Sequence, residues 1–192
     1  MSGPYDLVIA NARLRGEGER LQHVGVQEGR IAAIGAAALA GRLEVDAAGN
    51  LLTPSFVNAH LHLDKVYTLP MVGEEALRHY SGGGMGQAMT AIDLAARVKD
   101  RYEESWIYAN AGRALREGLK HGVTHVQAFA DTDTRARLEG VRALLRLREE
   151  WRGIIAIRVV AFPQDGVVRD AGAEEYVRQA LELGADLVGG IP

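Results

Sequence analysis

The sequence predicts an α/β protein with a small β unit over residues 1–52, followed over residues 53–192 by the first half of a (β/α)8 TIM barrel. Two observations predict the half-barrel. Apolar strands are expected to begin near residues 123, 154 and 186, a repeat that matches the length of a βα unit. A further apolar strand ends near residue 62 and brings the parallel strands to four, half the number in a closed barrel.

Short apolar runs separated by tight turns predict the N-terminal β unit. Strands are expected within residues 5–14, at residues 24–26 and over residues 31–34, with Gly29 in the last turn. A few short strands are only marginally stable in water, so we expect strands from elsewhere to complete this unit.

Residues 51–63 are dense in apolar side chains and end in a polar cluster, as is typical of a buried parallel strand with functional residues at its C-terminal end. A long irregular segment is expected from residue 66 to about residue 90. Its glycine run, residues 81–86, does not directly follow a strand. We therefore interpret the run as a loop and not as a phosphate-binding motif.

The rest of the chain alternates helices with strands, and each helix is expected to stop at a glycine. The expected order is a helix over 103–120, a strand over 123–129, a helix between 133 and 153, a strand over 154–162, a helix over 173–183 and a strand over 187–191. This order favours parallel strands joined by right-handed helical crossovers.

Composition narrows the classes of function. The 22 Lys and Arg residues against 25 Asp and Glu give a net charge of -3, which disfavours nucleic-acid binding. Export and membrane insertion are not expected, because the chain has neither a signal-peptide pattern nor a long apolar run. Cysteine is absent, so a metal site needs histidine or carboxylate ligands, and we expect a cytoplasmic protein.

Candidate site residues gather at the predicted C-terminal ends of the strands. His60 and His62 alternate along a strand, so both side chains point to the barrel interior, as ligands of a divalent metal would. The alternative to metal binding is that these histidines are hydrogen-bonded within the protein or face solvent. Asp64 and Lys65 follow directly.

Two further candidates follow the later strands. Asp131 and Asp133 lie at the C-terminal end of the strand predicted to end near residue 129. An aspartate that precedes a helix most often caps that helix, so capping is the favoured interpretation for both residues. Gln164 follows the next strand, where its amide suits a substrate edge with both C=O and N–H groups; an exposed loop glutamine is the alternative.

Three segments carry a family resemblance. NLLTPSFVNAHLHLDK, over residues 50–65, resembles the first barrel strand of the amidohydrolase superfamily. VAFPQDGV, over residues 160–167, and the C-terminal LELGADLVGGIP are similar to the cytosine deaminase branch, which includes aminohydrolases of triazines such as N-isopropylammelide.

The resemblance implies a metal-dependent barrel and a β-sandwich in which the N-terminal β unit pairs with strands from the far C-terminus. It implies that His60 and His62 bind one divalent ion, iron or zinc, and that Gln164 binds a small N-heterocyclic substrate. Asp64, Lys65 and Asp131 are candidates for supporting the ligands or lining the rim. The implied reaction is hydrolysis of a C–N bond in a pyrimidine-like or triazine-like cyclic amidine.

The family's other ligands and its proton-shuttling glutamate come later in the barrel, so the resemblance places no catalytic residue in these 192 residues. We expect the chain to need the C-terminal half of the barrel, to be inactive alone and to form a homo-oligomer. Phe129 stands where cytosine deaminases carry histidine, which favours a substrate other than cytosine. Two alternatives are a non-catalytic half-barrel that assembles with another chain, and an amidohydrolase of a non-pyrimidine amide.

Overall fold

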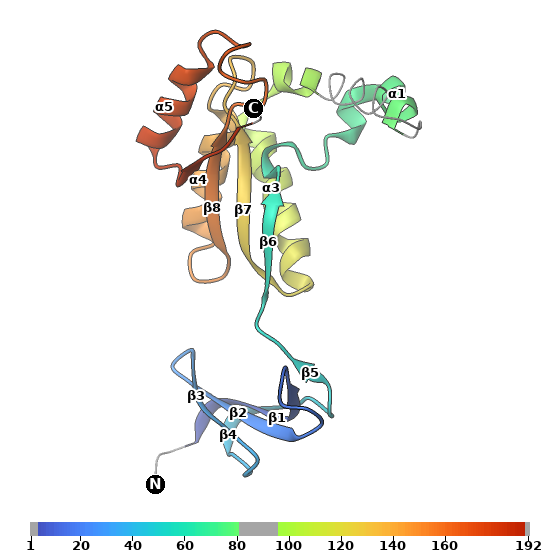
Figure 1. The fold of residues 1–192 in the computed structure, drawn as a ribbon, viewed down its shortest axis with the longest axis vertical. Helices are drawn as coiled ribbons and strands as arrows, with labels where there is room; N and C mark the ends of the chain where they lie inside the picture. The colour runs from blue at the N-terminus through green and yellow to red at the C-terminus, as the bar shows by residue number, and fades with distance from the viewer. Residues whose placement is uncertain (1–3, 81–95, 191–192) are drawn as a thin grey trace. The chain divides into compact units, whose positions relative to one another are not determined.

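Two β-sheets organise the chain, one in each of its two units, Met1–Pro54 and Ser55–Pro192 (Figure 1). The computed structural model describes residues 4–80 and 96–190. The predicted loop over residues 81–86 lies outside the described residues. The α/β class predicted from the sequence is confirmed.

The N-terminal unit is a mixed five-stranded sheet in the order β3-β2-β1-β4, with β5 also paired to β1. The three antiparallel strands are β1 (Tyr5–Leu14), β2 (Leu21–Gln27) and β3 (Arg30–Gly35). The two strands parallel to β1 are β4 (Gly41–Asp46) and β5 (Leu51–Leu52). The first three strands were predicted, whereas β4 was missed although its Leu43 and Val45 alternate with polar residues.

The second unit contains a parallel sheet in the order β6-β7-β8-β9. Its strands are β6 (Phe56–Leu61), β7 (Val123–Asp131), β8 (Ala156–Phe162) and the short β9 (Leu187–Val188). Because the strands are parallel, their C-terminal ends meet at one edge of the sheet, where functional residues from separate segments come together.

Helices cover one face of this sheet. The helices α3 (Glu104–Lys120) and α4 (Glu139–Glu150) pack against each other and the sheet, and α5 (Ala173–Leu183) packs on β8 (Figure 1). On β7, Val126, Ala128 and Ala130 face this helical layer and are buried. The alternate residues Gln127, Phe129 and Asp131 therefore face the opposite side, where the predicted site lies.

The prediction of an irregular segment over residues 66–90 is wrong in part, because the helix α1 (Leu69–Tyr80) lies within it. Pro70 is tolerated in a first helical turn, but Gly73 breaks the helical dihedrals with φ 80° and ψ 167°. Two short 3-10 helices, η1 (Leu63–Lys65) and η2 (Arg97–Arg101), flank the segment. Within the described ranges, no helix has the length and apolarity that crossing a membrane requires.

Candidate metal and substrate site

The two predicted metal ligands lie side by side near the C-terminal end of β6. The rings of His60 and His62 are 5.2 Å apart between centroids. Phe129 of β7 packs on His60 with a centroid distance of 4.2 Å, and Phe162 of β8 packs edge-on against His62 at 5.1 Å. Neighbouring strands thus supply an aromatic wall that limits how both imidazoles can turn.

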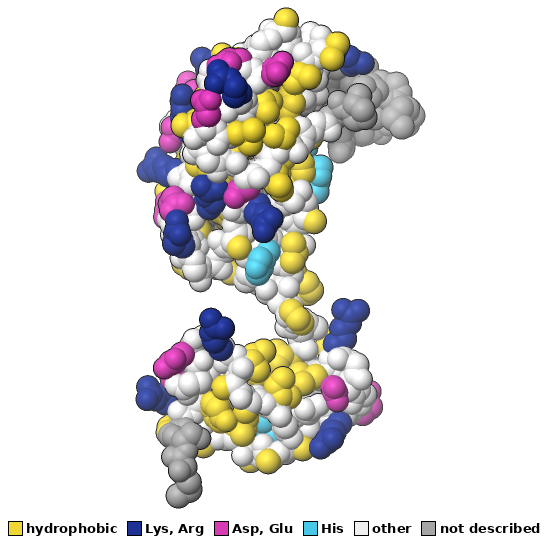
Figure 2. Space-filling model, turned by 60° about the vertical axis from the view of Figure 1, so that its left-hand side comes forward, with side chains coloured by type: hydrophobic (Ala, Val, Ile, Leu, Met, Phe, Trp, Pro, Cys, Tyr) yellow, Lys and Arg dark blue, Asp and Glu magenta, His cyan; other side chains and the backbone are white. Residues whose placement is uncertain are grey.

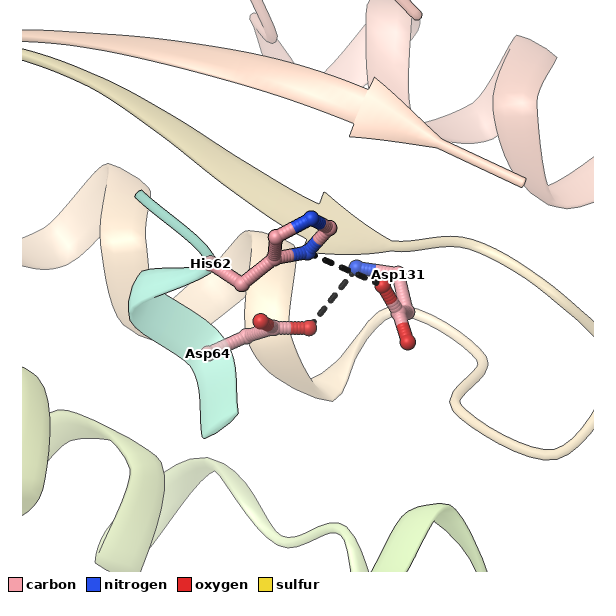
Figure 3. A group of neighbouring side chains, drawn as sticks. All are labelled: His62, Asp64 and Asp131. Atoms are coloured by element: carbon pink, nitrogen blue, oxygen red, sulfur yellow. Dashed lines mark hydrogen bonds and ion pairs between the residues drawn. The ribbon is translucent and has the colours of Figure 1, made fainter. Parts of the chain in front are cut away.

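His62 faces a carboxylate with one ring nitrogen. Its Nδ1 lies 3.8 Å from Oδ1 of Asp131 and is buried without a hydrogen-bond partner among the described residues. The other ring nitrogen points away from both neighbouring carboxylates (Figure 3). Metal-binding histidines usually turn one nitrogen to a carboxylate or carbonyl and the other to the metal, so this orientation fits a ligand.

Asp131 is completely buried at the end of β7. Its Oδ2 accepts a hydrogen bond from Nζ of Lys65 at 2.6 Å and lies 3.3 Å from Nζ of Lys99. Burial alone would raise its pKa, but the His62 ring and the two ammonium groups outweigh burial and lower the pKa to about 2. This carboxylate is therefore ionised at neutral pH.

The prediction that Asp131 caps a helix is wrong, because the Asp131 side chain contacts Lys65 and Lys99 instead. Asp133 makes such a contact instead, with its Oδ1 accepting the backbone N–H of Ala136 at 3.0 Å ahead of α4. Strand β7 extends to Asp131, two residues beyond its predicted end, and this places the Asp131 side chain on the same face as Phe129.

Asp64 holds η1 against β7. Its Oδ2 accepts a hydrogen bond from the hydroxyl of Tyr102 at 3.0 Å. The same oxygen accepts the backbone N–H of Asp131 at 2.8 Å (Figure 3). Burial and the charge of Asp131 raise the pKa of Asp64 to about 6. Gly140 permits this packing, because a Cβ there would lie 3.0 Å from the Cβ of Asp64.

Lys65 connects Asp131 with Gln164, which follows β8. Its Nζ donates to Oδ2 of Asp131 and to Oε1 of Gln164. Because an ammonium group only donates, the oxygen of the Gln164 amide must face Lys65. The amide nitrogen of Gln164 therefore remains able to donate to another group.

Lys99 of η2 is part of the same cluster and was not predicted. Its side chain is 2% exposed, and Nζ contacts Asp133, Asp165 at 3.0 Å and Asp131 at 3.3 Å. Burial would lower its pKa, but the three carboxylates raise it above the ordinary value. Lysines are mostly exposed, so no sequence pattern singled Lys99 out.

Within residues 4–80 and 96–190, two sets of side chains are candidates for holding a metal ion. His62, Asp64 and Asp131 offer one ligand atom each within 4.8 Å of one another. In that set, however, Oδ2 of Asp131 faces two ammonium groups, which oppose a second cation. The second set consists of the imidazoles of His60 and His62, and imidazole binds a metal in its neutral form.

Comparison with known proteins identifies the family. Residues 43–191 match the sequence profile of the amidohydrolase family. The chain belongs to the amidohydrolase family. The predicted resemblance is thereby confirmed.

The chain is similar to part of several longer proteins. The chain is 34% identical to N-isopropylammelide isopropyl amidohydrolase of Pseudomonas sp. strain ADP, over 100% of this chain and 46% of that protein. The structure of 5-methylcytosine deaminase from Klebsiella pneumoniae, liganded with 5-fluorocytosine, matches with a TM-score of 0.80 and 31% identity, over 96% of this chain and 43% of the other. N-isopropylammelide isopropylaminohydrolase from Burkholderia multivorans matches with a TM-score of 0.72 and 28% identity, over 96% and 44%. The chain thus spans less than half the length of each of these proteins.

The structure brings the six predicted site residues of this amidohydrolase into one cluster: His60, His62, Asp64, Lys65, Asp131 and Gln164. Other histidines lie elsewhere. His125 is exposed near the start of β7, and His121 is exposed just after α3.

Proposed function

We propose that this protein is a metal-dependent aminohydrolase that hydrolyses a C–N bond in a small pyrimidine-like or triazine-like cyclic amidine. The arrangement of His60 and His62 beside the polar pair Lys65 and Gln164 carries this proposal. The relatives named for N-isopropylammelide and 5-methylcytosine support the substrate class.

We assign His60 and His62 as ligands of one divalent ion, zinc or iron. The buried Nδ1 of His62 turns toward Asp131, which leaves the other ring nitrogen available for the ion. When bound, such an ion lowers the pKa of water and so supplies a nucleophile at neutral pH. Asp131 orients His62 through Oδ1 in this assignment, and its two lysine partners hold Oδ2.

Lys65 and Gln164 are assigned to substrate binding. Lys65 fixes the Gln164 amide so that its nitrogen can donate to a ring carbonyl or ring nitrogen of the substrate. Phe129 and Phe162, whose rings lie nearly perpendicular to each other, make the wall beside the histidines apolar and aromatic, which suits an aromatic heterocycle. Phe129 offers no hydrogen bond from its ring, and we therefore favour a substrate other than cytosine.

We further propose that strands beyond these four complete the site, as the C-terminal half of a (β/α)8 barrel. Among the described residues, β6 and β9 pair on one side only, and they expose Phe56, Val57 and Val188. The N-terminal sheet likewise exposes hydrophobic side chains (Figure 2). Leu43 and Ile31 are two of its exposed hydrophobic residues. Exposed edges and apolar faces of this kind require a covering partner.

A turnover assay tests the proposal. The native protein, loaded with zinc or iron, is incubated with cytosine, 5-methylcytosine and N-isopropylammelide, and released ammonia or amine is measured. We expect turnover of at least one compound, and a higher KM when Gln164→Leu removes the amide. Release from none of the heterocycles by metal-loaded protein would contradict this function and favour a non-catalytic half-barrel or a different amide substrate.

A further inference from the structure

Lys99 is a buried cation for which the assignments above provide no role. Its side chain is 2% exposed, and burying an ammonium group is costly unless charges and hydrogen bonds compensate it. Asp133 and Asp131 are completely buried partners, and Asp165 is a partly exposed third. Three carboxylates around one ammonium exceed what neutralising its charge requires.

The cluster joins three separate segments of the chain. Lys99 lies in η2, Asp131 and Asp133 lie at and after the end of β7, and Asp165 follows β8. Lys99 thus links the segment before α3 to the ends of two strands that carry site residues. Its most consequential partner is Asp131, because that carboxylate also contacts Lys65 and His62.

The two oxygens of Asp131 have different partners. Oδ2 lies between the ammonium groups of Lys65 and Lys99, whereas Oδ1 faces Nδ1 of His62. Two cations on one oxygen resist rotation of the carboxylate about its terminal torsion, which is otherwise broad. Lys99 also neutralises Asp133 and Asp165.

We propose that Lys99 is a positioning residue that fixes the Asp131 carboxylate and, through it, the orientation of His62, Lys65 and Gln164. The inference rests on the proposed aminohydrolase function. In this role Lys99 contacts neither the substrate nor the metal. Its effect reaches the ligand His62 through Oδ1 of Asp131 and the substrate-binding pair through Oδ2.

A purely structural ion pair would act on folding alone, and a double variant separates the two roles. Lys99→Met removes the ammonium and leaves the carboxylates uncompensated, so it is expected to be unstable. Adding Asp133→Asn removes one charge while keeping the side-chain oxygen that accepts from Ala136. The double variant should regain stability without regaining the cation on Asp131. Lys120→Met, at an exposed lysine paired with Glu117, is the control.

The test measures zinc affinity by competition with a chromophoric chelator, kcat and KM with a turned-over heterocycle, and the melting temperature, all on the native protein. For Lys99→Met/Asp133→Asn we expect zinc affinity to fall about tenfold and kcat/KM about 100-fold, with most of the melting temperature restored. Lys120→Met should match the wild type.

The outcomes separate the two proposals. A double variant within about twofold of wild type in zinc affinity and kcat/KM would overturn the positioning role and leave the aminohydrolase function standing. Wild-type protein that neither binds zinc nor turns over any heterocycle would overturn both proposals.

Discussion

Asp64 and Asp131 are neighbouring carboxylates, both completely buried, yet their pKa values shift in opposite directions. Their partners explain the difference. Asp131 lies beside two ammonium groups, whereas Oδ2 of Asp64 accepts from the neutral hydroxyl of Tyr102 and a backbone N–H. Residue identity alone therefore does not determine the pKa of a carboxyl group at this site; its burial and its neighbours do.

At the residue scale, Tyr102→Phe should destabilise the protein by about 1.5–3 kcal/mol, because it leaves a buried carboxylate oxygen without one of its donors. Urea unfolding measures the change. Tyr108→Phe is the control, since the Tyr108 hydroxyl bonds Glu150 on the surface and its loss should cost less than about 0.5 kcal/mol. Equal losses in the two variants would argue against the Asp64 contact.

At the scale of elements, the closeness of α4 to η1 depends on one missing side chain. Gly140→Ala places a Cβ 3.0 Å from the Cβ of Asp64 and should destabilise the protein by about 1–3 kcal/mol. Gly118→Ala in α3 is the matched control, with its nearest contact at an ordinary 3.6 Å. The control should be neutral or stabilising by up to about 1 kcal/mol in thermal unfolding. A Gly140 variant as stable as wild type would show that α4 can move away from η1 at no cost.

The elements with clear local signals were predicted well. The helix predicted over residues 173–183 is observed as Ala173–Leu183, because Gly184 in the left-handed conformation ends it. The helix α1 was missed, because Pro70, Gly73 and the following glycine run resemble a loop. For α4, the start was placed too early: Asp133 does accept a backbone N–H, but the regular helix begins at Glu139.

The candidate site was predicted only where it follows the strand pattern. His60, His62, Asp131 and Gln164 were found because they lie at or after predicted strand ends. Lys99 was not found, because its place depends on contacts with residues 32 or more positions away, and no local pattern encodes such contacts.

At the scale of the whole molecule, the exposed apolar residues of β6 and β9 predict association of the 192-residue chain. Sedimentation velocity should show concentration-dependent association, weakened in Val57→Lys/Val188→Lys because edge lysines oppose strand pairing. Val168→Lys is the control, since Val168 is 95% exposed and lies outside the strands. A wild-type chain that sediments as a monomer at all concentrations would contradict the proposal that further strands cover these edges.

The metal content of the native protein tests the central claim most directly. The protein is reloaded with zinc or iron and excess metal is removed. Inductively coupled plasma mass spectrometry should then find one metal ion per chain. His60→Gln/His62→Gln should lose that ion, whereas His125→Gln, at an exposed histidine near the start of β7, should retain it. Wild-type protein without bound metal, or a double variant that still binds one ion per chain, would contradict the assignment of His60 and His62 as the metal ligands.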